Sequence, residues 1–183
     1  MAWVNPSTRA VGAVVTASIW NQDVVANSEF LAKPPSCSLL RTTELSQAAG
    51  GGWRSIAWQS EQWDTDTMWS STAATRIDIN TPGKYEVQAL ITWTTNASAQ
   101  GRAMGIYAGA VGSSTVAPNQ AEHNWNGPAL AGFNPTNMLV ATLSLTSTST
   151  IRIQTAHNST SAITIRHTTA GQKPRVSVRW VSS

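Results

Sequence analysis

The feature that most constrains the fold of this chain is an alternation of apolar and polar residues with a period of two. It is clearest over 85–95, where one face of an extended chain collects the apolar side chains of Tyr85, Val87, Ala89, Ile91 and Trp93. Weaker or shorter stretches of the same kind lie at 38–44, 54–60, 75–80, 101–108, 139–146, 151–154, 163–165 and 176–180. A period of two is typical of strands with one buried face. The pattern predicts an all-β antiparallel sandwich of about eight to ten short strands.

The composition agrees with a water-facing β protein that carries little charge. Only 11% of the residues are charged, against about 25% in an ordinary soluble domain. The sequence instead holds 21 Ser and 23 Thr, and the β-branched Thr suits the solvated face of a strand. Exposed edge strands are usually guarded by lysine, of which the chain has three. We therefore expect an assembly that covers edges and apolar faces.

The N-terminal segment, residues 1–35, has a helical rather than an alternating pattern, and it precedes a predicted sandwich domain over 36–183. Thr16 is a candidate N-cap, and the Pro34–Pro35 pair after Lys33 ends the predicted helix of about four turns. Its apolar stripe, with Phe30 beside it, is Ala17, Trp20, Val24 and Leu31. A lone helix of this length is marginal in water. The stripe is expected to pack on the sandwich, on a copy of itself or on a larger partner.

Several classes of protein are not expected. The single cysteine, Cys37, excludes a disulfide within the chain and leaves an inert buried thiol or an intermolecular bridge. No stretch approaches the roughly 20 apolar residues of a membrane span, and the first residues lack the basic start of a secretion signal. The net charge is only +3 and the arginines are scattered, whereas a nucleic-acid partner calls for a basic patch. We expect neither membrane insertion nor nucleic-acid binding.

Catalytic and metal-binding patterns are weak. The three histidines are too widely spaced for a typical metal site. Glu61, Asp64 and Asp66 are compatible with a glycosidase pair or a calcium site, but they lack the further residues of a calcium loop and fit a solvated loop better. We expect a non-enzymatic protein without a metal or cofactor, and retain a carbohydrate-active enzyme as the least favoured alternative.

Tryptophan is over-represented, with nine Trp against two Phe and two Tyr. Trp93 and Trp180 are in phase with apolar strand residues, which predicts that both are core residues. An exposed indole stacks on sugar rings or anchors a protein interface. Core, subunit contact and ligand surface therefore all remain open for five residues: Trp53, Trp58, Trp63, Trp69 and Trp125. Trp125 lies in a polar stretch that predicts a loop, which makes it the best candidate for an outward-facing aromatic.

Two stretches of the sequence resemble a known group of proteins. One runs from Trp3–Val4 through Gly-Ala-Val-Val-Thr-Ala at 12–17 to Trp20–Asn21, Val24–Asn27 and Phe30–Leu31. It resembles the opening shared by small virion proteins of tailed bacteriophages, except that a usual Arg-Asp pair reads Val25–Ala26 here. The other runs from Trp63 to Gly101–Arg102 through Met68–Trp69, 76–79, the Thr-Pro-Gly-Lys-Tyr stretch at 81–85, and Trp93. It resembles the C1q/TNF-like jelly roll found in such phage proteins, and its Pro-Gly centre predicts a type II turn.

The resemblance implies a homotrimer of jelly-roll sandwiches around a threefold axis, joined to the phage particle by the N-terminal segment. The implied virion-attachment residues are Trp3, Thr16, Trp20, Asn21, Val24, Asn27, Phe30 and Leu31. The implied partners are copies of the chain and other virion proteins, and the implied location is the tail or capsid surface of the virion, after synthesis in the host bacterial cytoplasm. Two roles stay open: a tail-tip or fibre component that contacts the host surface, with a glycan as the expected ligand, and a capsid decoration protein.

Overall fold

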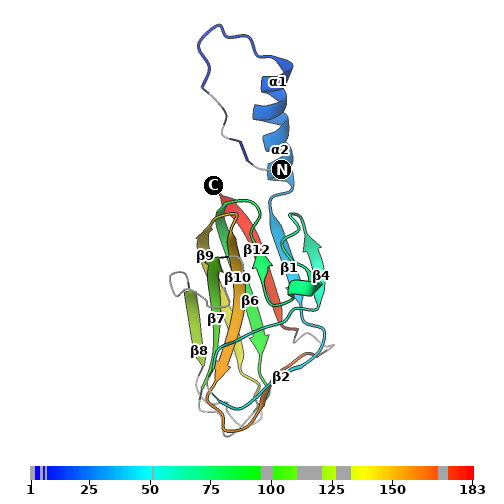
Figure 1. Ribbon diagram of the computed structural model, residues 1–183, viewed down its shortest axis with the longest axis vertical. Helices are drawn as coiled ribbons and strands as arrows, with labels where there is room; N and C mark the ends of the chain where they lie inside the picture. The colour runs from blue at the N-terminus through cyan, green and yellow to red at the C-terminus, as the bar shows by residue number, and fades with distance from the viewer. Residues whose placement is uncertain are drawn as a thin grey trace.

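The computed structural model describes residues 3–4, 6, 8–50, 52–95, 101–110, 133–168 and 173–183, together with the backbone of 121–126. Figure 1 shows an elongated β sandwich with a helix standing on one end, close to the C-terminus. All the strand pairs are antiparallel. The predicted antiparallel sandwich with one N-terminal helix is therefore confirmed.

The helix is continuous but not uniform. It begins as α1 (Ala17–Trp20), passes through the π-helical segment η1 (Asn21–Ala26) and ends as α2 (Asn27–Ala32). Thr16 caps it as predicted, because its hydroxyl oxygen accepts a hydrogen bond from the Ile19 amide at 3.3 Å. The π segment was not predicted; it has more residues in each turn than an α-helix and shifts the phase of the residues that follow it.

The sandwich consists of two main sheets and a small third one. The first has the order β4-β1-β12-β6-β9, with β1 (Ser36–Leu40), β4 (Ser60–Asp64), β6 (Gly83–Thr92), β9 (Thr136–Leu145) and β12 (Arg175–Ser182). The second has the order β3-β10-β7-β8, with β3 (Arg54–Ser55), β7 (Arg102–Ala110), β8 (Ala121–Asn126) and β10 (Ser149–His157); β5 (Ile77–Asp78) also pairs with β10. The small sheet pairs β2 (Leu45–Gln47) with β11 (Ile163–Ile165), and a 3-10 turn η2 covers Ser71–Ala73.

The strand pattern agrees with the sequence analysis in its apolar faces and differs at two edges. Trp93 and Trp180 are buried core residues, as predicted. Strands β4 and β8 were not expected, because both have largely polar sequences without a clear apolar face. Trp125 lies in β8 opposite Ala103 of β7, so its predicted place in a loop is wrong. The polar sequence reflects an edge strand, and the predicted outward direction of the Trp125 side chain lies outside what the structure describes.

The stretch before β6 shows why a glycine stands at position 83. Gly83 is the first residue of β6 and has a φ of +150°, so the predicted type II turn, which needs about +80° there, is wrong. A Cβ at this position would lie 2.2 Å from the indole nitrogen of Trp180. That nitrogen donates to the Pro82 carbonyl at 3.3 Å. Glycine is therefore required here by the close approach of Trp180 as well as by the backbone.

We predict that Gly83→Ala lowers the free energy of unfolding by about 3 kcal/mol, because overpacking and backbone strain add. Urea denaturation checks this value. Gly52→Ala is the matched control, since a Cβ at Gly52 meets no atom within 4 Å. Equal stability of the two variants would contradict the proposed packing.

Cys37 lies on β1 and is completely buried as a free thiol. Burial raises its pKa well above the ordinary value, and the carboxylates of Asp64 and Glu61 add to the rise. Of the two alternatives for Cys37, the inert buried thiol fits this environment. We predict that a disulfide exchange reagent leaves Cys37 unmodified in the native protein at pH 8 and modifies it once urea unfolds the chain. Rapid reaction of the native protein would contradict this burial.

Candidate functional site

Residues near the N-terminus fold back along the helix, and we call the described residues of 3–32 the N-terminal hairpin (Figure 1). The Asn27 side chain forms two hydrogen bonds with the backbone of the segment that runs beside the helix, in the way that a neighbouring strand does. Its Oδ1 accepts from the Val4 amide at 3.0 Å and its Nδ2 donates to the Val4 carbonyl at 2.8 Å. Arg9 and Asp23 form an ion pair at 3.4 Å further along the hairpin. The N-terminal segment is thus a folded unit rather than an extended tail.

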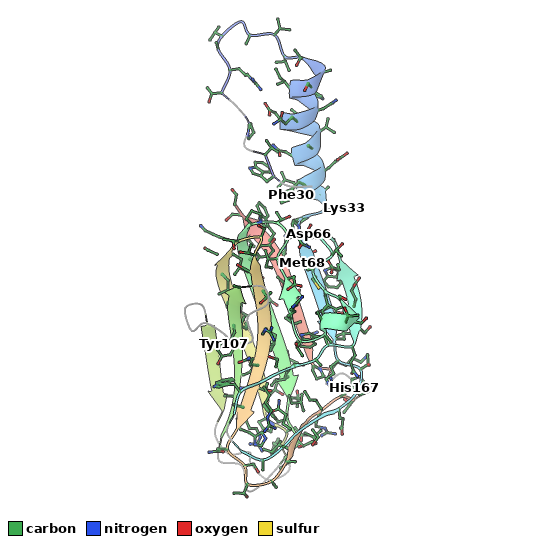
Figure 2. All side chains as sticks on the ribbon, viewed as in Figure 1. Phe30, Lys33, Asp66, Met68, Tyr107 and His167 are labelled. Atoms are coloured by element: carbon green, nitrogen blue, oxygen red, sulfur yellow. The ribbon has the colours of Figure 1, made fainter. Side chains whose placement is uncertain are left out.

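An aromatic contact fixes the N-terminal hairpin to the sandwich. The ring of Phe30 meets the Trp180 indole edge-on at a centroid distance of 4.8 Å, and Trp3 contacts Phe30 at 6.3 Å. Phe30 is only 2% exposed. Figure 2 shows Phe30 and Lys33 at the junction between helix and sandwich, close to Asp66. Phe30 therefore packs within the chain and joins the helix to the sandwich.

The predicted attachment residues divide into two groups. Asn27 and Phe30 are buried within the chain, Trp3 is half-buried, and Thr16 caps the helix. The others are exposed: Trp20, Asn21, Val24 and Leu31. Three valines in the segment that precedes the helix are exposed as well: Val11, Val14 and Val15. No part of the described sandwich covers the apolar stripe of the helix, so the stripe does not pack on its own domain.

We predict that Phe30→Ala lowers the free energy of unfolding by about 3 kcal/mol, because a buried ring is removed from between two indoles. The neighbouring Leu31→Ala should change it by less than about 0.5 kcal/mol, since Leu31 is exposed. Chemical denaturation of both variants, followed by tryptophan fluorescence, checks the contrast. A larger loss in Leu31→Ala would show that the helix packs differently.

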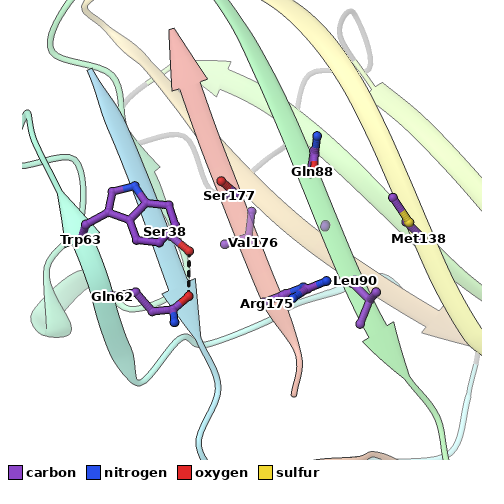
Figure 3. A pocket seen from close by; sticks show the side chains of 10 residues that line it. Ser38, Gln62, Trp63, Gln88, Leu90, Met138, Arg175, Val176 and Ser177 are labelled. Atoms are coloured by element: carbon purple, nitrogen blue, oxygen red, sulfur yellow. Dashed lines mark hydrogen bonds between the residues drawn. The ribbon is translucent and has the colours of Figure 1, made fainter. Parts of the chain in front are cut away.

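The second candidate site is a groove of about 300 Å³ on the solvent-facing side of the five-stranded sheet. We call it the outer groove, and Figure 3 shows it crossing the sheet from β4 to β9. Its apolar part comes from Trp63, Leu90 and Met138. Its polar side chains are Ser38, Gln62, Gln88, Arg175 and Ser177. The outer groove is therefore a mixed surface in which aromatic, aliphatic and uncharged polar groups outnumber charges.

A β-bulge explains how both Gln62 and its neighbour Trp63 line the outer groove. Ser38 pairs with Trp63 and Leu39 pairs with Glu61, which leaves Gln62 as the extra residue of β4. Such a bulge breaks the alternation of side chains between the two faces. The Gln62 Oε1 accepts from the Ser38 hydroxyl at 3.1 Å (Figure 3). Trp63 remains 48% exposed, so half of a large apolar side chain faces solvent.

The face around the outer groove exposes further large apolar side chains on β9. Met138 and Val140 of β9 are 58% and 46% exposed, and both point away from the core. The same face also carries charge, because Arg175 of β12 lines the outer groove and Glu86 of β6 and Arg179 of β12 occupy paired positions. Large apolar side chains exposed on one face are a feature of interaction surfaces.

The remaining tryptophan candidates do not gather at this site. Trp58 is a core residue at 2% exposure. Trp69 is half-buried, and its indole N–H donates to the Ala74 carbonyl at 3.4 Å. Trp53 lies beside the second sheet, 40% exposed, with its ring 5.5 Å from that of Tyr107. Of the four candidates whose side chains the structure describes, Trp63 alone lines the outer groove.

The acidic stretch does not form a paired catalytic site. Both carboxylate oxygens of Asp64 accept backbone amides, from Asp66 at 3.1 Å and from Trp69 at 2.9 Å. Asp64 thus shapes the turn after β4, as a residue of a structured loop does. Glu61 points to solvent from β4. Within the described parts of the chain, no three His, Cys, Asp or Glu side chains gather as metal ligands do.

Comparison with known proteins gives a clear result for the fold. By sequence, the chain matches no family model and no curated protein. By structure, it matches the globular domain of zebrafish complement 1qA with a TM-score of 0.54 and 9% identity, over 80% of this chain and 97% of that one. The chain has a C1q/TNF-like jelly-roll fold.

Two further structures share this C1q/TNF-like jelly roll. The Eiger TNF of S. frugiperda matches with a TM-score of 0.58 and 8% identity, over 81% of this chain and 94% of that one. Murine APRIL matches with a TM-score of 0.56 and 7% identity, over 80% and 98%. At these identities the likeness concerns the fold.

In the described residues no helix has the length and apolar character of a membrane span.

Proposed function

We propose that this C1q/TNF-like chain is a non-enzymatic homotrimeric knob of a tailed bacteriophage particle. The observation that carries the proposal is the apolar face around the outer groove, with Trp63, Leu90, Met138 and Val140 uncovered on one side of the sandwich. Burial of such a face stabilises an assembly by about 25 cal/mol for each Å² of apolar area removed from water. Proteins of this fold usually assemble as homotrimers, which makes three the expected number of copies.

The two edges of the sheet carry different apolar residues, and contact between them is compatible with a closed ring of copies. Strand β9 is both an edge of the sheet and the site of Met138 and Val140, whereas Trp63 lies at the opposite edge on β4. An edge of one copy can therefore seat against the outer groove of the next. Contacts between two different surfaces close into a ring when the rotation fits. The same contact covers an edge strand that has few lysines to guard it.

Attachment to the particle is assigned to the exposed part of the N-terminal hairpin. The motif that resembles the opening of phage virion proteins maps onto this hairpin, and Trp20, Val24 and Leu31 form an uncovered apolar stripe on it. Helices with such a stripe bind by laying it into a groove of a partner. Because the hairpin is anchored through Phe30, it holds the knob at a fixed angle.

The favoured role is a tail-tip or fibre component that contacts a host glycan, and capsid decoration is the alternative. Trp53 is 40% exposed beside Tyr107 on the second sheet, away from the outer groove. Aromatic faces of this kind stack on sugar rings. Adsorption of phage that carry Trp53→Ala tests this role: reduced adsorption supports it, and normal adsorption favours decoration.

We predict that Met138→Lys weakens the trimer by roughly a hundredfold, because a lysine at this position must be buried without a partner in each copy. Sedimentation velocity measures the shift from trimer to monomer at micromolar concentration. Lys84→Ala, an exposed position near the start of β6, is the control and should remain trimeric. A wild-type monomer under these conditions would contradict the ring.

We predict that the double variant Trp20→Ser with Leu31→Ser folds and forms trimers but is incorporated into particles at least tenfold less than wild type. Both side chains are exposed, so their loss leaves the core intact. Quantitative immunoblotting of purified particles measures incorporation, with the exposed helix residue Ser28→Ala as control. Normal incorporation would place the attachment surface elsewhere.

A further inference from the structure

A buried histidine lies at the distal end of the sandwich, where β10 ends. This is the end away from the N-terminal hairpin (Figure 1). His157 is the last residue of β10 and is 2% exposed. Its ring meets Trp93 edge-on at a centroid distance of 6.2 Å. Neither the proposed trimer nor the attachment uses this buried histidine.

The hydrogen bond to His157 defines its protonation state. The Ser159 amide donates to His157 Nδ1 at 3.2 Å. An Nδ1 that accepts a hydrogen bond has no proton, so the imidazole is neutral and carries its hydrogen on Nε2. Nε2 is buried, and no described residue accepts a hydrogen bond from it.

The turn that follows His157 ties together three segments that are distant in sequence. The Gly50 amide donates to the Ser159 carbonyl at 3.3 Å. The Asn158 amide donates to the Gly101 carbonyl at 3.3 Å, and the Gly101 amide donates back to Asn158 Oδ1 at 2.7 Å. We call this arrangement of 157–159 with Gly50 and Gly101 the distal clasp. It holds the segment before β3 and the start of β7 against the end of β10.

The charged groups that act on His157 are both positive. Arg102 of β7 lies directly opposite His157 in the strand register and is completely buried. Arg54 of β3 acts on it from the other neighbouring strand. The last residue of β2, Gln47, and its neighbour Ala48 contribute backbone groups, which favour the charged imidazole. No carboxylate among the described residues acts on this ring.

We propose that the distal clasp is an acid-sensitive switch, in which protonation of His157 at Nδ1 opens the clasp. The proton occupies the nitrogen lone pair that accepts the Ser159 amide, so that hydrogen bond is lost. The imidazolium also adds a positive charge in a buried position, opposite the buried Arg102 and within the influence of the exposed Arg54. Both effects favour a form in which residues 158–159 move away and His157 reaches water.

The direction of the pH dependence follows from burial. Burial, followed by the charges of Arg54 and Arg102, lowers the pKa of His157 in the closed clasp, although the backbone of Gln47 and Ala48 opposes this. In the open form His157 titrates near its ordinary value of about 6.5. The closed form is therefore fully stable above about pH 6.5 and loses stability as the pH falls below it. Opening should increase up to about tenfold for each pH unit, until the closed form itself binds the proton.

Native-state hydrogen exchange between pH 7.5 and 5.0, corrected for the intrinsic exchange rate, tests the switch on the full chain. The amides of Gly50, Gly101 and Ser159 are expected to lose protection below about pH 6.5, by about tenfold at pH 5.5. His157→Asn keeps an acceptor near the position of Nδ1 but has no proton to bind, so its protection should not vary with pH. His167→Asn removes the half-buried histidine that follows β11 and should leave the wild-type profile intact.

A flat wild-type profile, or the same profile in His157→Asn as in wild type, would overturn the switch. Titration of the wild-type imidazoles by NMR gives a second test that does not depend on a variant's folding. The His157 ring should be protonated on Nε2 alone at pH 7 and should titrate below pH 6.5, together with the change at the Ser159 amide. Titration of His157 above pH 6.5 would also overturn the proposal.

Discussion

The contact between Trp180 and Gly83 is the constraint on which the placement of the other parts depends. Trp180 lies on β12. This strand is the last of the described strands in sequence, but it runs in the middle of its sheet, between β1 and β6. Its indole occupies the space where any side chain at position 83 would be, and its outer edge receives Phe30. One side chain thus joins the C-terminal strand, the start of β6 and the N-terminal hairpin. The direction in which the hairpin leaves the sandwich follows from this contact.

The apolar faces of the long strands and the N-terminal helix could be predicted from the sequence, because alternation and helical spacing reflect burial directly. Trp93, Trp180 and the Thr16 cap are examples. The parts that could not be predicted depend on partners far away in sequence. The bulge that turns Trp63 into the outer groove needs β1, and the burial of Asn27 needs the returning chain at Val4. Strand β8 could not be predicted from the alternation of apolar residues, because an edge strand needs no apolar face.

The proposed roles occupy separate surfaces of one small domain. The face around Trp63 and Met138 is assigned to contacts between copies, the exposed stripe of Trp20 and Leu31 to the particle, and Trp53 to a ligand. The low charge of the chain fits this division, since hydroxyl and amide groups keep the remaining surface soluble without opposing assembly. The buried polar groups His157 and Arg102 lie opposite each other at the distal end, where β10 ends and β7 begins.

The central claim is a threefold knob whose copies meet through the outer groove and whose hairpins hold it to the particle. Electron cryomicroscopy of particles that carry the protein tests this claim most directly. The account predicts a threefold density in which Trp63 and Met138 are covered by neighbouring copies, with three hairpins entering the particle and the distal ends pointing outward. A single sandwich at each site, a trimer that leaves the outer groove open to solvent, or a knob attached through its distal end would contradict it.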